Sequence, residues 1–150
     1  MKMPILVSAC LLGESVRYDA KALPHSDVMM LSKQGYELVA ICPEVAGGLP
    51  VPRAATEICC ADSGSQPRVI SCMGEDVTAQ FEQGAAAAFA LAKARGITTA
   101  VLKEGSPSCG SCTIYDGTFS GNRIAGEGIT TRLLRMHGIR VLSELRLDEL

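Results

Sequence analysis

The stretch TAVLKEGSPSCGSC, residues 99–112, joins an apolar strand to a loop of small, reactive side chains. Residues 99–102 form a short apolar run bounded by turn-forming residues, which predicts a buried strand. Pro107 prevents the strand from continuing and pushes the residue before it toward extended geometry. Gly105 and Gly110 allow backbone angles that other residues resist. We therefore expect hydroxyl and thiol groups to be held on a stiff loop at the end of a strand.

Apolar runs and helical patterns on both sides of this stretch indicate an alternating α/β chain. Strands are predicted over residues 4–9, 37–41, 99–102 and 139–142, and helices over residues 28–34, 76–95 and 128–137. The runs 56–60 and 68–72 flank a polar turn at 62–66 and predict a β-hairpin. The pattern predicts one domain, residues 1–150: a Rossmann-like three-layer sandwich with a mainly parallel sheet, of order about 2-1-3-4, and an inserted β-hairpin.

Composition excludes several classes of protein. The 150 residues carry a net charge of −2 with the two signs interspersed, which argues against a large nucleic-acid partner. No run approaches the roughly 20 apolar residues of a membrane span, and the first residues lack the features of a signal peptide. We therefore expect a cytoplasmic protein. Seven cysteines, an odd number, then indicate a metal site or reactive thiols rather than a disulfide framework.

Three of the cysteines each follow the end of a predicted parallel strand. Cys10 follows the first strand, Cys42 the second and Cys109 the third. In open α/β sheets, ligands bind beyond the carboxyl ends of the strands, near the point where the strand order reverses. Because these strands are neighbours in the predicted order, we expect the three thiols to share one site.

The remaining cysteines have other interpretations. Cys59, Cys60 and Cys72 belong to the predicted hairpin, where free cysteine usually packs as a small buried side chain. Cys112 forms a Cys-x-x-Cys pair with Cys109, a spacing that suits a redox pair or a metal site. The spacing leaves two roles open for Cys112: it is either a fourth ligand or a thiol that lies next to the ligands without binding the metal.

The donor set favours iron and sulfur over zinc. Structural zinc usually takes two close pairs of ligands, and the chain has a single Cys-x-x-Cys. Of the two histidines, His25 lies at the cap of the helix predicted over 28–34, and His137 lies at the end of the helix predicted over 128–137. All-cysteine ligation suits an iron–sulfur cluster. Three cysteines on a [4Fe-4S] cluster would leave one iron open as a Lewis acid, which indicates catalysis more than electron transfer.

Five motifs in order resemble the thiouracil desulfidase (TudS) family. They are SACLLG at 8–13, CPE at 42–44, GGLPVPR at 47–53, GEDVT at 74–78 and the stretch 103–110. The resemblance implies a [4Fe-4S] cluster held by Cys10, Cys42 and Cys109, with one open iron, and catalytic roles for Glu44 and Ser106. It implies non-redox removal of sulfur, as sulfide, from 2- or 4-thiouracil or 4-thiouridine monophosphate. The iron–sulfur assembly machinery is then an expected partner.

Elementary chemistry is consistent with these roles. A thiocarbonyl sulfur is soft and prefers iron to a hydrogen-bond donor. Glu44 follows Cys42 closely and is the natural general base for a water that attacks the thiocarbonyl carbon. Ser106 would orient this water or relay a proton.

Further residues near the same edge are candidates for contacts with the substrate. Arg17, Arg53 and Lys103 would meet the phosphate of a nucleotide, and Ser8 and Ser108 carry hydroxyls beside the predicted ligands.

Two other functions are compatible with the cysteine pattern. One is a cluster-free redox or sulfur-transfer protein that uses Cys109 and Cys112. The other is a zinc-stabilised binding module without activity. The metal content of the protein distinguishes all three.

Overall fold

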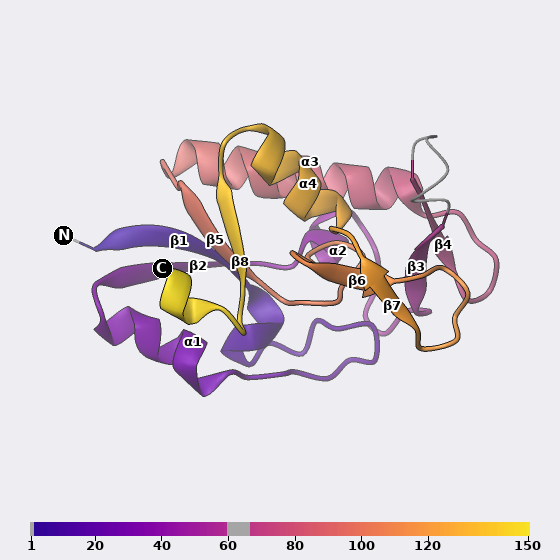
Figure 1. Ribbon diagram of the computed structural model, residues 1–150, viewed down its shortest axis with the longest axis horizontal. Coiled ribbons are helices and arrows are strands. Elements are labelled where there is room, and N and C mark those ends of the chain that lie inside the picture. The colour runs from indigo at the N-terminus through magenta and orange to yellow at the C-terminus, as the bar shows by residue number, and fades with distance from the viewer. Residues whose placement is uncertain (1, 60–66) are drawn as a thin grey trace.

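The computed structural model describes residues 2–59 and 67–150 (Figure 1). The strands are β1 (Met3–Ser8), β2 (Tyr36–Ile41), β3 (Thr56–Cys59), β4 (Arg68–Ser71), β5 (Thr99–Leu102), β6 (Thr113–Tyr115), β7 (Arg123–Ala125) and β8 (Arg140–Ser143). The α-helices are α1 (Ser26–Met30), α2 (Pro43–Ala46), α3 (Thr78–Ala94) and α4 (Ile129–Met136), and the 3-10 turns are η1 (Ala9–Leu12), η2 (Leu31–Lys33) and η3 (Leu147–Glu149). Cys60 and the predicted turn at 62–66 lie outside the described residues.

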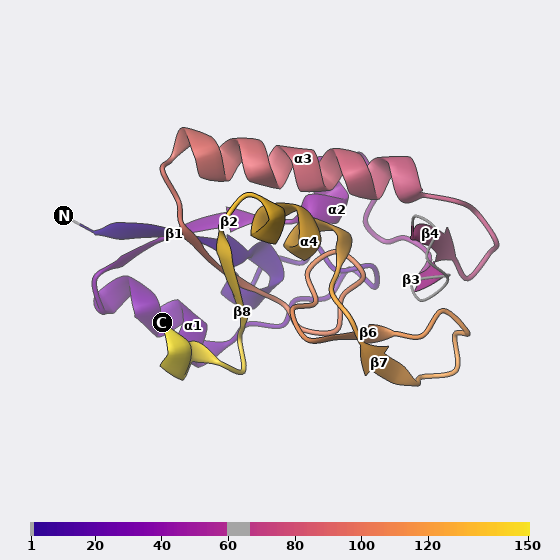
Figure 2. The same ribbon diagram turned by 45° about the horizontal axis from the view of Figure 1, so that its top comes forward.

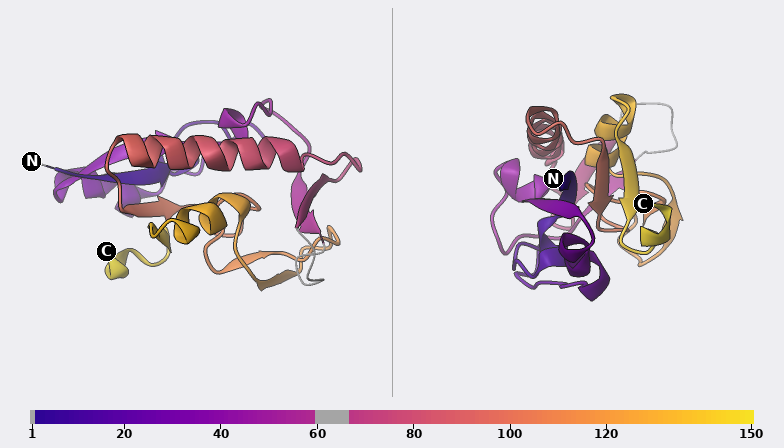
Figure 3. Two further views of the ribbon diagram at one scale, coloured as in Figure 1. Left: turned by 90° about the horizontal axis from the view of Figure 1, so that it is seen from above. Right: turned by 90° about the vertical axis from the view of Figure 1, so that its left-hand side faces the viewer.

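The central sheet has the order β2-β1-β5-β8, and all of its neighbouring strands are parallel. This is the predicted order 2-1-3-4, which is confirmed. It places β1 between β2 and β5, so the ends of these three strands lie side by side. Helices α3 and α4 cover one face of the sheet and α1 the other, as Figure 3 shows. The three-layer sandwich is therefore also confirmed.

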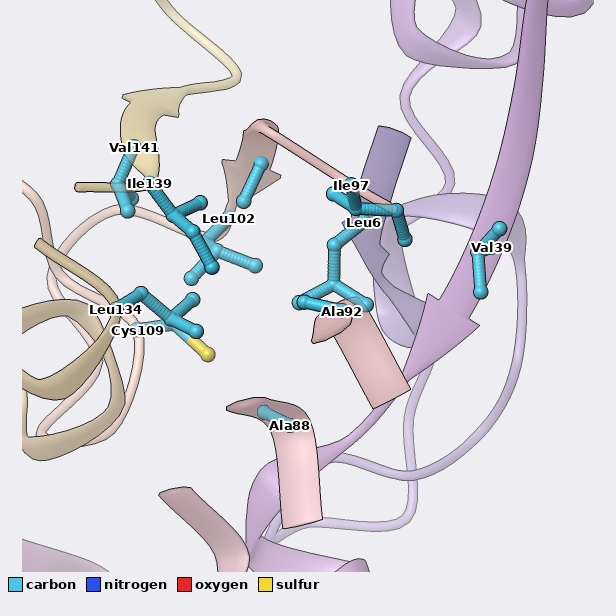
Figure 4. Close-up of a cluster of buried hydrophobic side chains, with 11 residues drawn as sticks. Leu6, Val39, Ala88, Ala92, Ile97, Leu102, Cys109, Leu134, Ile139 and Val141 are labelled. Carbon is cyan, nitrogen blue, oxygen red and sulfur yellow. The ribbon is translucent and has the colours of Figure 1, made fainter. Parts of the chain in front are cut away.

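Alternate residues of the central strand enter two different cores. Leu6 packs with Ala88 and Ala92 of α3 in the cluster of Figure 4, whereas Ile5 and Val7 pack on the side of α1. This follows from the two-residue period of a strand. The alanines bring α3 close to the sheet, which explains the alanine-rich centre of this helix.

Two small hairpins extend beyond the carboxyl ends of the central strands (Figure 1). Strand β3 pairs with β4, as predicted, and β6 pairs with β7. The glycine-rich residues 115–121 include the end of β6 and the connection to β7. The two hairpins contact each other through β3 and β6.

The structure adds an element that the sequence analysis did not predict. Residues 43–46, just after Cys42, form the short helix α2, which begins at Pro43. Proline suits the first helical position because its fixed φ matches a helix and because an N–H at this position would have no acceptor within the helix. Helix α2 packs directly against α3 (Figure 2). A Cβ at Gly84 of α3 would lie 1.9 Å from the Pro43 carbonyl oxygen, so only glycine fits at this position.

The long helix also begins slightly later than expected. It starts at Thr78 with Val77 as its N-cap residue, and Asp76 lies one position earlier. The Asp76 Oδ1 atom nevertheless accepts hydrogen bonds from the Thr78 backbone N–H (2.9 Å) and the Thr78 hydroxyl (2.6 Å). Asp76 therefore supports the first turn of α3 from outside the helix.

Candidate active site

A cavity of about 480 Å³ opens at the carboxyl ends of β1, β2 and β5. Cys10, Cys42 and Cys109 all line this cavity, together with Glu44 and Ser106. The volume is within the range of small-molecule sites, about 300–1,000 Å³. The fold thus brings five residues from three remote segments into one pocket, at the position expected for a parallel sheet.

Cys10 is held in the 3-10 turn that follows β1. Its carbonyl oxygen accepts the backbone N–H of Gly13 at 3.2 Å and that of Leu23 at 3.1 Å. Gly13 has a φ of 95°, a left-handed conformation that glycine adopts without strain. The turn leaves the side chain of Cys10 against the cavity with 8% exposure.

Cys42 and Glu44 are positioned by α2. Cys42 is the N-cap residue of this helix, and its carbonyl oxygen accepts the backbone N–H of Ala46 at 2.9 Å. The Cys42 thiol donates a hydrogen bond to the Val16 carbonyl oxygen at 3.8 Å. Because α2 lies on α3 through the close approach at Gly84, both side chains are fixed relative to the main body of the fold.

Cys109 lies in a loop that is tied to the start of α4. Its carbonyl oxygen accepts the Thr131 hydroxyl at 2.9 Å, and its backbone N–H donates to the Ser106 hydroxyl oxygen at 3.1 Å. A Cβ at Gly128 would lie 2.3 Å from the Ser108 carbonyl carbon, so this glycine lets α4 begin directly against the loop. Figure 4 shows the Cys109 sulfur beside the apolar side chains of the core.

Burial favours the protonated form of all three thiols. Burial, assisted by the neighbouring Cys42, raises the pKa of Cys10 to about 11, and burial raises the pKa of Cys109 to about 12. Burial also raises the pKa of Cys42. A deprotonated Cys42 would raise the pKa of both other thiols, so loss of a proton from one thiol opposes its loss from the others. A bound metal cation would supply the positive charge that the deprotonated thiols need.

Glu44 is a largely buried carboxylate that pairs with Arg53. Its side chain is 17% exposed, and its Oε1 atom lies 3.4 Å from Nε of Arg53. Burial raises the pKa of Glu44, and the attraction of Arg53 partly opposes this shift. The Arg53 side chain is 5% exposed and also donates to the carbonyl oxygens of Val16 and Pro50, each at 3.0 Å. Arg53 therefore holds Glu44 in place and has little freedom to meet a phosphate.

Ser106 uses its oxygen to close the loop around Cys109. Its Oγ atom accepts the backbone N–H groups of Ser108 at 3.0 Å and Cys109 at 3.1 Å. With both acceptor positions occupied, the hydroxyl hydrogen remains available to donate into the cavity.

The other predicted contact residues have different surroundings. Ser8 lines the cavity, accepts the Lys103 backbone N–H at 2.9 Å and hydrogen-bonds to the Cys109 thiol. Ser108 is buried, pairs with Thr130 at 2.8 Å and is not part of the cavity wall. Both hydroxyls lower the pKa of Cys109 and thus act on the thiol.

The cations of the cavity differ in how firmly they are held. Lys103 Nζ lies 3.2 Å from a carboxylate oxygen of Glu144, whereas Arg17 has a longer contact, 3.6 Å, with Asp19. Arg123, which the sequence analysis did not single out, also lines the cavity and lies over the Tyr115 ring at 5.1 Å. No sequence motif marks Arg123, because it reaches the cavity only through the pairing of β6 with β7.

The structure separates Cys112 from the three converging thiols. Cys112 is exposed and lies outside the cavity wall, and Cys72 is exposed as well. Cys59 is half-buried in the β3–β4 hairpin, and its thiol donates to the Gly117 carbonyl oxygen at 3.7 Å. In the described ranges 2–59 and 67–150, no three His, Cys, Asp or Glu side chains are close enough together to hold a single metal ion. Three soft thiol donors on separate elements around a roomy cavity nevertheless fit a polynuclear iron–sulfur group.

Fold and site together define a class: a Rossmann-like α/β protein with three cysteine thiols, a buried carboxylate and a serine at the carboxyl edge of its sheet. The chain belongs to the 2-thiouracil desulfurase family, whose model matches residues 5–146. It is 39% identical over 150 residues to the uncharacterized protein YbbK of Bacillus subtilis (strain 168), covering 97% of this chain and 99% of that protein.

A solved structure described as the [4Fe-4S]-dependent thiouracil desulfidase TudS is also similar. It superimposes with a TM-score of 0.86 at 49% sequence identity, covering 99% of this chain and 95% of that chain. The family resemblance noted from the five motifs is thereby confirmed. None of the helices in the two described ranges is long and apolar enough to cross a membrane.

Proposed function

We propose that this chain is a [4Fe-4S]-dependent desulfidase that converts the C=S group of a thiolated uracil to C=O and releases sulfide. The observation that carries the proposal is the sharing of one cavity by Cys10, Cys42 and Cys109 with Glu44 and Ser106. Membership of the 2-thiouracil desulfurase family, and 49% identity to a protein described as a [4Fe-4S]-dependent thiouracil desulfidase, support it.

Cys10, Cys42 and Cys109 would hold the cluster through their thiolates. When bound, the cluster would supply an iron without a protein ligand, a soft Lewis acid suited to sulfur. The chain's own contribution is to bury the three sulfurs at the ends of β1, β2 and β5 and to leave the cavity open beside them.

Glu44 is assigned as the general base. It lines the same cavity as the thiols, two residues from Cys42, and Arg53 keeps its carboxylate from turning away. Glu44 would accept a proton from a water whose oxygen bonds to the thiocarbonyl carbon. The C–S bond then breaks, and the sulfur leaves as sulfide with the protons of the water. Carbon keeps its oxidation level, so the step needs no electron donor.

Ser106 is assigned as a hydrogen-bond donor to the reacting groups. Its oxygen already accepts two backbone N–H groups, which favours donation of its own hydrogen. Donation of this hydrogen would stabilise negative charge that develops on the substrate.

The cavity suits a planar thiolated pyrimidine, as the base or as a nucleotide: 2-thiouracil, 4-thiouracil or 4-thiouridine monophosphate. Of the predicted phosphate contacts, Arg17 is the most available, since its guanidinium has one distant carboxylate partner. Thiol ligation of a cluster suits a reducing compartment, so we place the enzyme in the cytoplasm and expect the iron–sulfur assembly machinery to load it.

Anaerobic purification followed by an assay tests the proposal. We expect brown protein with broad absorption near roughly 400 nm, about four irons and four sulfides per chain, and conversion of thiouracil to uracil with release of sulfide. Colourless protein with one zinc per chain would instead indicate a binding module. Colourless, metal-free protein whose Cys109 and Cys112 form a reversible disulfide would indicate a redox protein.

A further inference from the structure

The loop that carries Ser106 and Cys109 closes around one buried carboxylate. Oε1 of Glu104 accepts the backbone N–H of Gly105 at 3.2 Å, at the start of the loop. The same atom accepts the backbone N–H groups of Ser111 (3.0 Å), Cys112 (3.0 Å) and Thr113 (3.1 Å), at the end of the loop. One carboxylate oxygen thus joins both ends of the segment.

The second oxygen of this carboxylate is also occupied. Oε2 of Glu104 accepts the Ser111 hydroxyl at 2.8 Å, and the residue is only 8% exposed. Burial by itself raises the pKa of Glu104, but the hydrogen bonds from Cys112, Thr113 and Ser111 outweigh it, and the pKa lies below its usual range. The charged form is therefore the one that the loop stabilises.

Glu104 is in turn anchored to the sheet. Its backbone N–H donates to Oε1 of Glu144, just after β8, at 2.8 Å. The neighbouring Lys103 forms an ion pair with the other oxygen of Glu144 at 3.2 Å. The loop is therefore anchored to two adjacent strands, β5 and β8, through Glu104, the second residue after the end of β5.

We propose that Glu104 is the positioning residue that sets the places of Cys109 and Ser106 before any cofactor is bound. Within the loop, the Ser106 hydroxyl accepts the Cys109 N–H, so movement of the loop ends would displace both side chains together. The relevance of these two side chains to catalysis rests on the proposed function, but their positioning by Glu104 does not. It can be measured in full-length protein without an activity assay.

The test compares Glu104→Ala with Glu104→Gln by hydrogen–deuterium exchange over residues 105–113 of the full-length protein. Alanine leaves four backbone N–H groups without their acceptor, and we expect about tenfold faster exchange of Ser111, Cys112 and Thr113. Glutamine keeps the carbonyl oxygen that accepts these four groups, and the Ser111 hydroxyl can turn to accept from its amide. We therefore expect Glu104→Gln to remain within about threefold of the wild type.

A second measurement follows Cys109 itself. After iron is removed by chelation, alkylation by iodoacetamide is followed by mass spectrometry. Cys109 should react about tenfold faster in Glu104→Ala than in the wild type or Glu104→Gln, since opening of the loop exposes it. Asp76→Ala is the matched control, because this carboxylate also accepts a backbone N–H but lies outside the cavity wall. It should leave the alkylation of Cys109 unchanged.

The outcomes are separable from those of the desulfidase assay. Folded Glu104→Ala with wild-type exchange and alkylation would overturn the proposal, as would an equal effect of Asp76→Ala or of Glu104→Gln. Should the alanine variant fail to fold, Glu104→Asp, whose carboxylate is one methylene short of its partners, is judged by the same criteria. After anaerobic loading, Glu104→Ala should contain less iron per chain than the wild type, whereas Glu104→Gln should contain as much as the wild type. A protein inactive on thiouracil that still shows these differences would reject the proposed function and keep Glu104 as the positioning residue.

Discussion

At the scale of single residues, the site depends on which thiols face the cavity. Cys10, Cys42 and Cys109 do so, whereas Cys112 is exposed and lies outside the cavity wall. The Cys-x-x-Cys spacing by itself allows Cys112 to be a further ligand, but its position in the structure argues against that role. Substitution of individual cysteines can therefore distinguish the proposed ligands from the cysteines that do not bind the cluster.

Replacing Cys10, Cys42 or Cys109 by alanine should each abolish stable binding of the cluster, because two remaining thiolates rarely hold one. Cys72→Ala and Cys112→Ala, at exposed positions, should retain full iron content. Cys59→Ala should also retain it and cost about 1 kcal/mol of packing. Iron and labile sulfide per chain, measured after anaerobic purification, check this. Full iron content and activity in Cys10→Ala would contradict the shared site.

Replacing Glu44 by glutamine should separate catalysis from cofactor binding. Glutamine keeps the shape and an oxygen for Arg53 but accepts no proton, so the rate should fall by about 10²–10⁴-fold. Iron content and KM should stay close to those of the wild type. Glu14→Gln, at an exposed position outside the cavity wall, is the control and should not change the rate. Undiminished desulfidation by a fully loaded Glu44→Gln protein would remove Glu44 from the mechanism.

At the scale of elements, α2 is positioned by its contact with α3. The carbonyl oxygen of Pro43 occupies the place where a side chain at position 84 would begin. Gly84 therefore determines how closely Cys42 and Glu44 approach the sheet. Glycine within a helix normally lowers stability, and at this position the close approach of two backbones explains its presence.

Gly84→Ala should destabilise the protein, although alanine is the better helix former. The clash with Pro43 should lower the free energy of unfolding by about 1–3 kcal/mol, against the gain of about 0.5–1 kcal/mol expected in an open helix. Because α2 would move away, the iron content should fall as well. Urea unfolding and iron analysis measure both effects. Ala86→Gly, at an exposed position of α3, gives the effect of helix propensity alone and should leave the iron content intact.

Asp76 should make the start of α3 sensitive to acid. Hydrogen bonds from Thr78, together with those from Arg68, lower the pKa of Asp76 from 3.8 to about 2. The unfolded chain therefore binds the proton more tightly, and falling pH favours unfolding between these two values. The free energy of unfolding should be lower in Asp76→Asn than in the wild type at pH values above 3.8, and the difference should shrink as the pH approaches 2. Urea titrations of both proteins at several pH values measure it, and a difference independent of pH would contradict the assignment.

At the scale of the whole molecule, the parallel order β2-β1-β5-β8 brings three distant segments to one edge of the sheet. The thiols and Glu44 come from three segments that are separated by long stretches of chain. The two small hairpins extend the same end of the molecule (Figure 1). This arrangement supports the proposed function, because a carboxylate, a hydroxyl and three thiols line one cavity.

The overall reaction should run without a reductant once the cluster is intact. Water replaces sulfur at the carbon with no net electron transfer, so one sulfide should be released per uracil formed. A single-turnover assay under anaerobic conditions, with and without dithionite, measures this stoichiometry. Loading is quantified first, so that damage to the cluster is not mistaken for a need for electrons. Strict dependence on a stoichiometric electron donor would contradict a hydrolytic reaction.

The amino-acid sequence alone predicted the layers, the strand order and the segments that meet at the site. Apolar runs mark the parallel strands, and right-handed connections leave few ways to order them. Cys10, Cys42 and Cys109 could be grouped because each follows such a run directly. The carboxyl ends of neighbouring parallel strands necessarily lie at one edge, so this grouping depends on topology and not on side-chain detail.

Only the tertiary structure decided how the remaining side chains are used. Arg53 is a plausible phosphate contact by sequence, yet the fold commits it to Glu44 and to two carbonyl oxygens. Glu104 carries no sequence signal of its own, because its partners are backbone N–H groups that any residue provides. Cys112 is exposed and lies outside the cavity wall, although its spacing from Cys109 suits a shared site. Strand topology follows from the pattern of apolar residues along the chain, whereas hydrogen-bond partners depend on distances that are set only when the elements pack.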